Sequence, residues 1–209
     1  MVTRILITLN ILAFLFELYT GALHSEAALV RDGVLIPIFV TQYGQWWRIF
    51  TAAFLHAGVW HIAVNMLSLF WLGRFIEVVL RPFRMALVYF VSLVASGASI
   101  VLFSAPNVPT LGASGAIFGL IGALFAIGLR LGERGRDLVQ SNVPILVLNL
   151  LWTFLMPGIS WQAHIGGLIA GFVVTYIIYS PPRPVMTRAY DQATGAVYES
   201  NVEMPYDRD

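Results

Sequence analysis

A run of 19 residues without a charge, 85–103, most constrains what this chain can fold into. A helix of about 20 apolar residues crosses the hydrocarbon core of a bilayer, whereas the buried helices of soluble domains are usually shorter. Other long apolar stretches occur on both sides of it. In chain order, the stretches are 5–23, 59–80, 85–103, 114–130, 143–157 and 162–179. They predict an all-α, polytopic membrane bundle of six transmembrane helices.

The composition supports a membrane protein. Only 11% of the 209 residues are charged and 58% are hydrophobic, whereas about a quarter of a soluble domain is charged. We expect a membrane domain at 1–180 and a polar, mobile cytoplasmic tail at 181–209. The net charge of +1 gives no reason to expect nucleic-acid binding. The absence of cysteine excludes thiolate chemistry.

The arginines orient the predicted spans, because basic residues concentrate in cytoplasmic loops. With both termini in the cytoplasm, only Arg31 and Arg48 of the twelve basic residues fall outside, which leaves ten inside. Both lie in a predicted external loop, 24–58. Its aromatic residues suit the membrane–water interface, so we expect the loop to lie partly in the outer leaflet.

Polar residues open three of the predicted spans, although such groups are costly in lipid and usually mark function. The second span opens with His56, His61 and Asn65, the fourth with Ser114 and the sixth with His164. All three spans run from outside to inside, so these residues are predicted to share one layer near the outer surface. His61 and Asn65 are four residues apart and share a helical face. His56 belongs to the junction with the preceding loop.

Glycines on two of these spans predict a close helix–helix contact. Stripes of small residues let membrane helices approach closely. The two stripes are Gly115, Gly119 and Gly122 on the fourth span, and Gly167 and Gly171 on the sixth. If they meet, Ser114 lies beside His164.

A serine beside a histidine can act as a nucleophile, because the imidazole accepts the hydroxyl proton. Donors for an oxyanion are available from Asn65, the ring of His61 and the backbone N–H of Ser114. Gly112 and Gly115 would let a substrate backbone approach. No Asp or Glu is expected in this layer, which favours a Ser–His dyad over a triad.

These residues resemble the motifs of the rhomboid family of intramembrane serine proteases over residues 46–171. The matching motifs are Trp47-Arg48, His56-x4-His61-x3-Asn65, Gly73-x3-Glu77, Gly112-x-Ser114-Gly115 and His164-x2-Gly167-x3-Gly171. The resemblance implies the compact bacterial form, in the cytoplasmic membrane, cleaving transmembrane helices of other membrane proteins near their outer ends. It also implies nucleophile Ser114, general base His164, an oxyanion hole of His61, Asn65 and the Ser114 N–H, and no cofactor.

The same residues allow other interpretations. Ser114 could be a helix cap, and the histidines could be hydrogen-bonding residues between helices. A zinc site is disfavoured, because no His-Glu-x2-His occurs and Asn is a poor ligand. A transporter or a non-proteolytic, client-binding membrane protein are the alternative functions. Trp47-Arg48 is expected to anchor the external loop, and Glu77 to pair with a cytoplasmic arginine.

Overall fold

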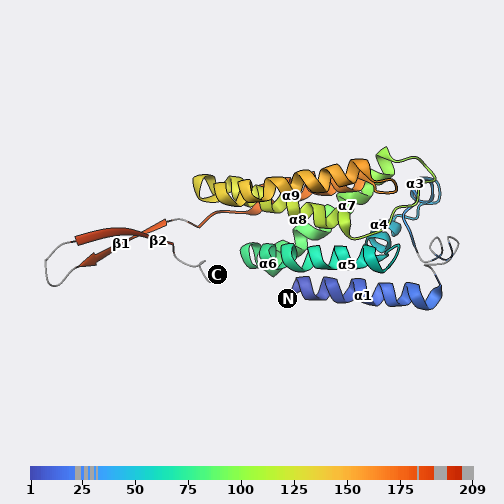
Figure 1. The fold of residues 1–209 in the computed structure, drawn as a ribbon, viewed down its shortest axis with the longest axis horizontal. Helices are drawn as coiled ribbons and strands as arrows, with labels where there is room; N and C mark the ends of the chain where they lie inside the picture. The colour runs from blue at the N-terminus through green and yellow to red at the C-terminus, as the bar shows by residue number, and fades with distance from the viewer. Residues whose placement is uncertain are drawn as a thin grey trace. The chain divides into compact units, whose positions relative to one another are not determined.

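A computed structural model describes residues 1–21, 25, 28, 31, 33–182, 184–190 and 197–203, the last two ranges by their backbone alone. It divides into two compact units, Met1–Tyr179 and Ser180–Asp209. The α-helices, of which all but α10 are labelled in Figure 1, are α1 (Val2–Thr20), α3 (Pro37–Thr41), α4 (Arg48–Thr51), α5 (Val59–Ser68), α6 (Arg74–Leu80), α7 (Pro82–Phe103), α8 (Ser114–Arg130), α9 (Arg136–Leu155) and α10 (Trp161–Ile178).

The predicted all-helical membrane bundle is confirmed. Each predicted apolar stretch overlaps a helix, although residues 22–23 of the first lie outside the described residues, and α5, a π-helical turn (Leu69–Gly73) and α6 form one continuous span. Of the described residues, five helical segments are long and apolar enough to cross a membrane. The fourth predicted span, α8, has 17 residues, which gives a length of about 25 Å.

The fifth predicted span has different bounds from those expected. The sequence predicted an apolar stretch at 143–157, but α9 contains 20 residues, begins at Arg136 and passes through Pro144. Proline removes one backbone donor from a helix, and membrane helices tolerate this where neighbouring groups satisfy the freed carbonyl. Residues 136–142 therefore belong to the helix as well.

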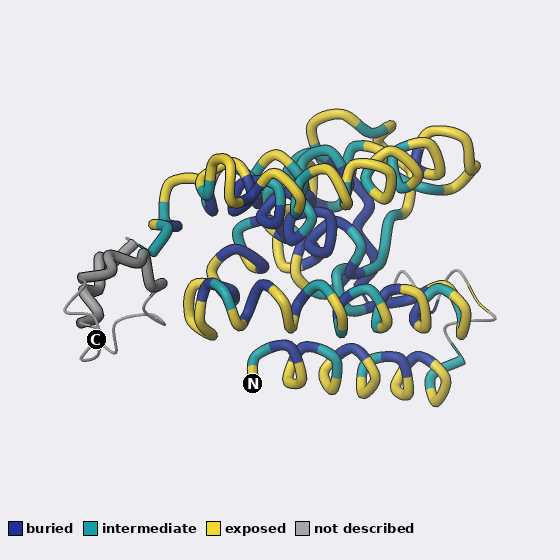
Figure 2. The backbone as a smooth tube through the Cα atoms, turned by 60° about the vertical axis from the view of Figure 1, so that its left-hand side comes forward, coloured by how far each residue is buried: buried dark blue, intermediate teal, exposed yellow. Residues whose placement is uncertain are grey.

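Helix α8 lies at the centre of the bundle. Most of its side chains are buried, from Gly115 to Gly128, and Figure 2 shows this buried region between the outer helices. Outer helices bury one side only: in Figure 2, α1 is buried along one side and exposed along the other. A helix that is apolar all round is suited to a central position. This arrangement explains why the shortest apolar span can begin inside the bundle.

Glu77 joins α6 to the beginning of α1. Its carboxylate accepts hydrogen bonds from the backbone N–H of Val2 at 2.7 Å, from the N–H of Thr3 at 2.9 Å and from the Thr3 hydroxyl at 2.7 Å. The expectation of an arginine partner was wrong. The free N–H groups of a helix N-terminus attract negative charge, and here they bind a buried carboxylate.

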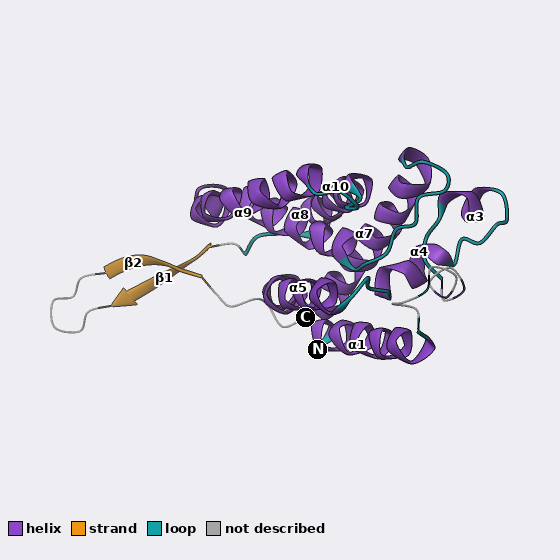
Figure 3. Cartoon of the chain, turned by 45° about the vertical axis from the view of Figure 1, so that its right-hand side comes forward, coloured by secondary structure: helices purple, strands orange, loops and turns teal. Residues whose placement is uncertain are grey.

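The segment before α5 supports the extended chain that leads into α8 (Figure 3). Leu35 and Thr110 exchange backbone hydrogen bonds of 3.1 and 2.8 Å, and the Gly112 N–H donates to the Ala52 carbonyl at 2.8 Å. Arg48 is buried, stacks on Trp47 and donates to the Val34 carbonyl at 2.9 Å. Arg48 thus anchors this segment, as expected for the Trp-Arg pair.

The second unit contains regular structure that we did not predict. Strands β1 (Pro184–Tyr190) and β2 (Val197–Glu203) pair as an antiparallel hairpin. The prediction of a mobile tail rested on its polar, Pro-rich composition, which does not report strand pairing. Residues 183, 191–196 and 204–209 of the tail lie outside the described part of the chain.

Candidate active site

The glycine stripes of α8 and α10 meet, as the sequence predicted. A Cβ atom built on Gly167 would lie 1.9 Å from the Gly115 carbonyl oxygen, and one on Gly171 would lie 2.0 Å from the Gly119 oxygen. These distances leave no room for a side chain, so the two helix backbones touch directly. The contact sets the register between α8 and α10, and with it the separation of the residues at their beginnings.

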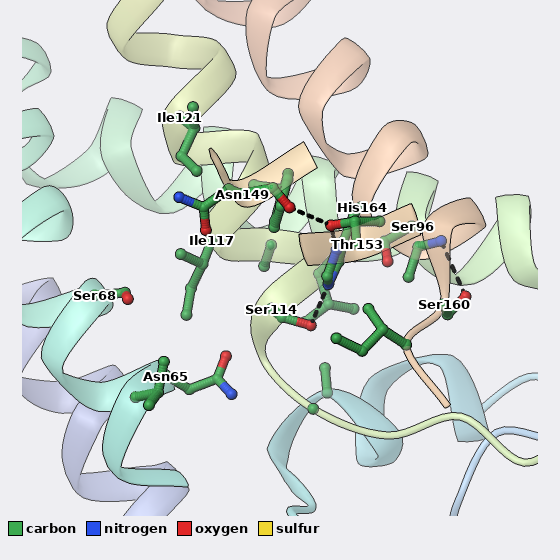
Figure 4. Close-up of a pocket in the computed structure, with 18 of the residues that line it drawn as sticks. Asn65, Ser68, Ser96, Ser114, Ile117, Ile121, Asn149, Thr153, Ser160 and His164 are labelled. Carbon is green, nitrogen blue, oxygen red and sulfur yellow. Dashed lines mark hydrogen bonds between the residues drawn. The ribbon is translucent and has the colours of Figure 1, made fainter. Parts of the chain in front are cut away.

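Ser114 and His164 lie side by side at this end of the helix pair (Figure 4). His164 Nε2 is 2.9 Å from Ser114 Oγ, so the predicted contact is present. Ser114 is the first residue of α8, and the N-cap position belongs to Ala113. No side-chain cap is formed there, so Ser114 is not the helix cap that its sequence context suggested.

Two further side chains contact the His164 ring, and neither was predicted from the sequence. The Phe118 ring stacks on it, with centroids 4.0 Å apart and planes 11° apart. The Thr153 hydroxyl on α9 lies 2.7 Å from His164 Nδ1. Phe118 could have been found, because it follows Ser114 by one helical turn. Thr153 carries no such signal, since nothing in its spacing relates α9 to α10.

His61 and Gly112 form a neighbouring part of the site. The Ala57 N–H donates to His61 Nδ1 at 3.2 Å, so the proton of a neutral His61 ring is on Nε2. Gly112 packs against that edge: a Cβ built there would lie 2.9 Å from Nε2 and 3.8 Å from Ser114 Oγ. With φ at +122°, Gly112 also has a backbone conformation that favours glycine. Gly112 therefore lies against both the Nε2 edge of His61 and the Ser114 hydroxyl.

Asn65 lies across the cavity on α5, with its amide extending toward the Ser114 side (Figure 4). One of its N–H groups donates to the His61 carbonyl at 2.9 Å, which leaves the second for another acceptor. One cavity of about 740 Å³ between the membrane helices is lined by Asn65, His61, Ser114 and His164.

Gly115 has a packing role, because a Cβ on it would lie 2.0 Å from Ser96 Oγ on α7.

His56 supports the site from the loop junction and is fully buried. Its Nδ1 lies 3.2 Å from the Phe54 carbonyl, and its ring packs edge-on against that of His61. Burial, with a smaller contribution from His61, lowers the pKa of His56 to about 4. The His56 backbone N–H donates to the buried Glu17 carboxylate of α1 at 3.0 and 3.1 Å. Glu17 thereby ties α1 to the segment that precedes the His61 helix.

The donor set of the site suits acyl transfer. A hydroxyl contacts a histidine nitrogen, and N–H donors lie on the adjoining wall of the same cavity. Within the described residues, no group of three or more His, Asp or Glu side chains could hold a metal ion. The hydroxyl and imidazole in contact are groups that can carry out nucleophilic acyl transfer.

Comparisons with known proteins identify the family of the chain. A family model described as the rhomboid domain matches residues 43–181. The chain is 36% identical over 172 residues to the rhomboid protease GluP of Bacillus subtilis, a match that covers 81% of this chain and 33% of GluP. It is 32% identical over 166 residues to the putative rhomboid protease YdcA of the same organism, covering 79% of this chain and 83% of YdcA. It is also 33% identical over 153 residues to inactive RHOMBOID-like protein 8 of Arabidopsis thaliana, covering 70% of this chain and 42% of that protein. The chain is a multi-pass integral membrane protein that belongs to the rhomboid family.

Proposed function

We propose that this protein is an intramembrane serine endopeptidase with Ser114 as nucleophile and His164 as general base. The observation that carries the proposal is the 2.9 Å separation of Ser114 Oγ and His164 Nε2 inside a cavity between membrane helices. A serine hydroxyl is a weak nucleophile until an adjacent base accepts its proton. The family match and the relatives named as proteases support the same reaction.

In the first half of the reaction, Ser114 Oγ attacks the scissile carbonyl carbon while its proton passes to His164 Nε2. The carbonyl oxygen becomes an oxyanion. The Ser114 N–H is available to bind it, because the first residue of a helix has no carbonyl one turn earlier to pair with. His61 Nε2–H and the second Asn65 amide hydrogen supply further donors. Donors aimed at the developing charge stabilise the transition state most.

In the second half, the proton on His164 Nε2 passes to the leaving nitrogen as the C–N bond breaks. An acyl group then remains on Ser114 Oγ. His164 next removes a proton from water, the resulting hydroxide attacks the acyl carbon, and Ser114 leaves with a proton from His164. The dyad is thereby restored without a metal or a redox partner.

The substrates we propose are transmembrane segments of other membrane proteins. The cavity lies among helices that are apolar on their outer sides, so a peptide in lipid reaches it more directly than a soluble one. A helical carbonyl is already hydrogen-bonded within its own helix. The segment must therefore unwind locally before Ser114 can attack, which favours cleavage near its outer end.

A non-proteolytic, client-binding function is the second candidate. One relative at 33% identity is named inactive, so membership of the family does not by itself imply catalysis. A client binder needs the cavity but not a reactive serine. The two functions therefore differ in the reactivity of Ser114 and not in substrate binding.

The deciding experiment measures labelling by a fluorophosphonate, which reacts with activated serines, together with cleavage of a reconstituted single-span substrate. Ser114→Ala should abolish labelling and lower turnover by on the order of 10⁶-fold. His164→Ala should abolish labelling as well. Ser141→Ala is the matched control, because Ser141 on α9 is exposed and donates only to the Asp137 carbonyl. Wild-type labelling of the Ser114 variant would refute the protease assignment.

A further inference from the structure

Thr153 occupies an unusual position on α9. It is the one residue of this 20-residue helix that is buried, with 2% of its surface exposed. Its hydroxyl lies 2.7 Å from His164 Nδ1 and also 2.7 Å from the Asn149 carbonyl oxygen one turn earlier in α9. The hydroxyl therefore contacts two groups at once, of which only one can receive its single proton.

The chemistry of the two partners determines where that proton goes. A carbonyl oxygen only accepts, so the hydroxyl proton points at Asn149. Thr153 Oγ1 then presents a lone pair to His164, which requires a proton on Nδ1. A neutral imidazole carries one proton, so Nε2 is left as an acceptor. Nε2 is the nitrogen that lies 2.9 Å from Ser114 Oγ.

We propose that Thr153 is a positioning residue that selects the reactive tautomer of His164. This inference rests on the proposed protease function and adds a third member to the Ser114–His164 pair. Thr153 performs the orienting task that a carboxylate performs in a Ser–His–Asp triad. A neutral hydroxyl is the less costly choice here, because an additional charge between membrane helices is expensive to bury.

The opposite tautomer is disfavoured by the same contacts. If Nδ1 were the acceptor, Thr153 would turn its proton toward His164. Lone pairs of Thr153 Oγ1 and of the Asn149 carbonyl oxygen would then face each other across 2.7 Å. The Nε2 proton would then point at Ser114 Oγ, and no base would be available. The stacked Phe118 ring restricts the imidazole plane, so the ring cannot turn away to escape this arrangement.

The first test is kinetic. Thr153→Val keeps the shape but removes the acceptor, and kcat should fall about 10- to 100-fold, as for a lost buried hydrogen bond, with KM little changed. Thr153→Ser keeps the hydroxyl and should restore most of kcat. Thr175→Val is the matched control, because Thr175 is buried on the same helix as His164 and its hydroxyl has no hydrogen-bond partner among the described residues. The control should retain wild-type kcat.

The second test observes the tautomer directly and does not depend on any variant of Thr153 folding. Nitrogen-15 spectra of the histidine-labelled wild type, with the His164 signals assigned by comparison with His164→Ala, should show Nδ1 protonated and Nε2 bare at neutral pH. A protonated Nε2 would overturn the inference, as would unchanged kcat in Thr153→Val. If the wild type shows no Ser114-dependent labelling, the proposed function fails instead, and the spectrum still decides the tautomer.

Discussion

Helices α9 and α10 follow one another in the chain and both contribute to the His164 environment, but they are held in opposite ways. Helix α10 touches the α8 backbone directly through Gly167 and Gly171. Helix α9 buries one side chain, Thr153, and exposes most of the others. The proposed nucleophile and base thus lie on the tightly packed pair, whereas the residue proposed to orient the base comes from the loosely packed helix.

This difference separates two requirements of the proposed reaction, which are the distance between Ser114 and His164 and the orientation of the His164 proton. The distance between Ser114 and His164 depends on a backbone-to-backbone contact, which has no side chain that could rearrange. The orientation of the His164 proton depends on one hydroxyl at 2.7 Å. A small displacement of α9 would leave the first intact and weaken the second. Substitutions in α10 test the dependence of the Ser114–His164 distance on the backbone contact. Measurements on α9 test how loosely that helix is packed.

The largest effect is expected from Gly171→Leu. A Cβ at Gly171 would lie 2.0 Å from the Gly119 oxygen and 2.5 Å from its carbonyl carbon, and backbone atoms cannot move aside. The two helices should separate, and both the folded state and fluorophosphonate labelling should be lost. Thermal unfolding in detergent measures this. Ile169→Ala on the same helix, where the side chain is 57% exposed, should behave as wild type. A Gly171→Leu protein with normal unfolding and labelling would disprove the proposed dependence on the contact.

A smaller effect should distinguish buried from exposed leucines. Leu120 on α8 is 0% exposed, and Leu120→Ala should lower the free energy of unfolding by about 2 kcal/mol or more through the cavity it leaves. Leu148 on α9 is 65% exposed, and Leu148→Ala should change it by no more than about 0.5 kcal/mol. Denaturant titration of both variants gives the comparison. Equal losses would mean that α9 is packed as firmly as α8.

The smallest effect is expected in wild-type hydrogen exchange. Local opening is easier where few side chains are buried, so amides of α9 should exchange about 10-fold faster than those of α10 in detergent. Mass spectrometry of peptides from the two helices measures the rates. Residues near Thr153 should be the slowest of α9, because that turn carries its buried contact. Uniform exchange across α9 and α10 would contradict the distinction.

Much of the candidate site was predictable, because its residues are of types that can react or bind charge and they recur at helical spacing. His61 and Asn65 are one turn apart, and the glycines after Ser114 and His164 mark the faces that meet. Thr153 and Phe118 were missed, since threonine and phenylalanine occur in membrane helices for many reasons. The partner of Glu77 was assigned wrongly, because charge balance favours an arginine and does not reveal the free N–H groups at the beginning of α1.

The sequence by itself determined that the chain is a membrane helix bundle, because hydrophobicity summed over a span depends only on composition and order. It also indicated which glycine-lined faces could approach, and predicted the candidate catalytic residues beside them. Only the tertiary structure decided that Ser114 and His164 stand 2.9 Å apart, and that the Thr153 hydroxyl lies at His164 Nδ1. The reason is geometric. Each helix can rotate about its axis and shift along it without changing its own sequence pattern, and only packing against its neighbours fixes both.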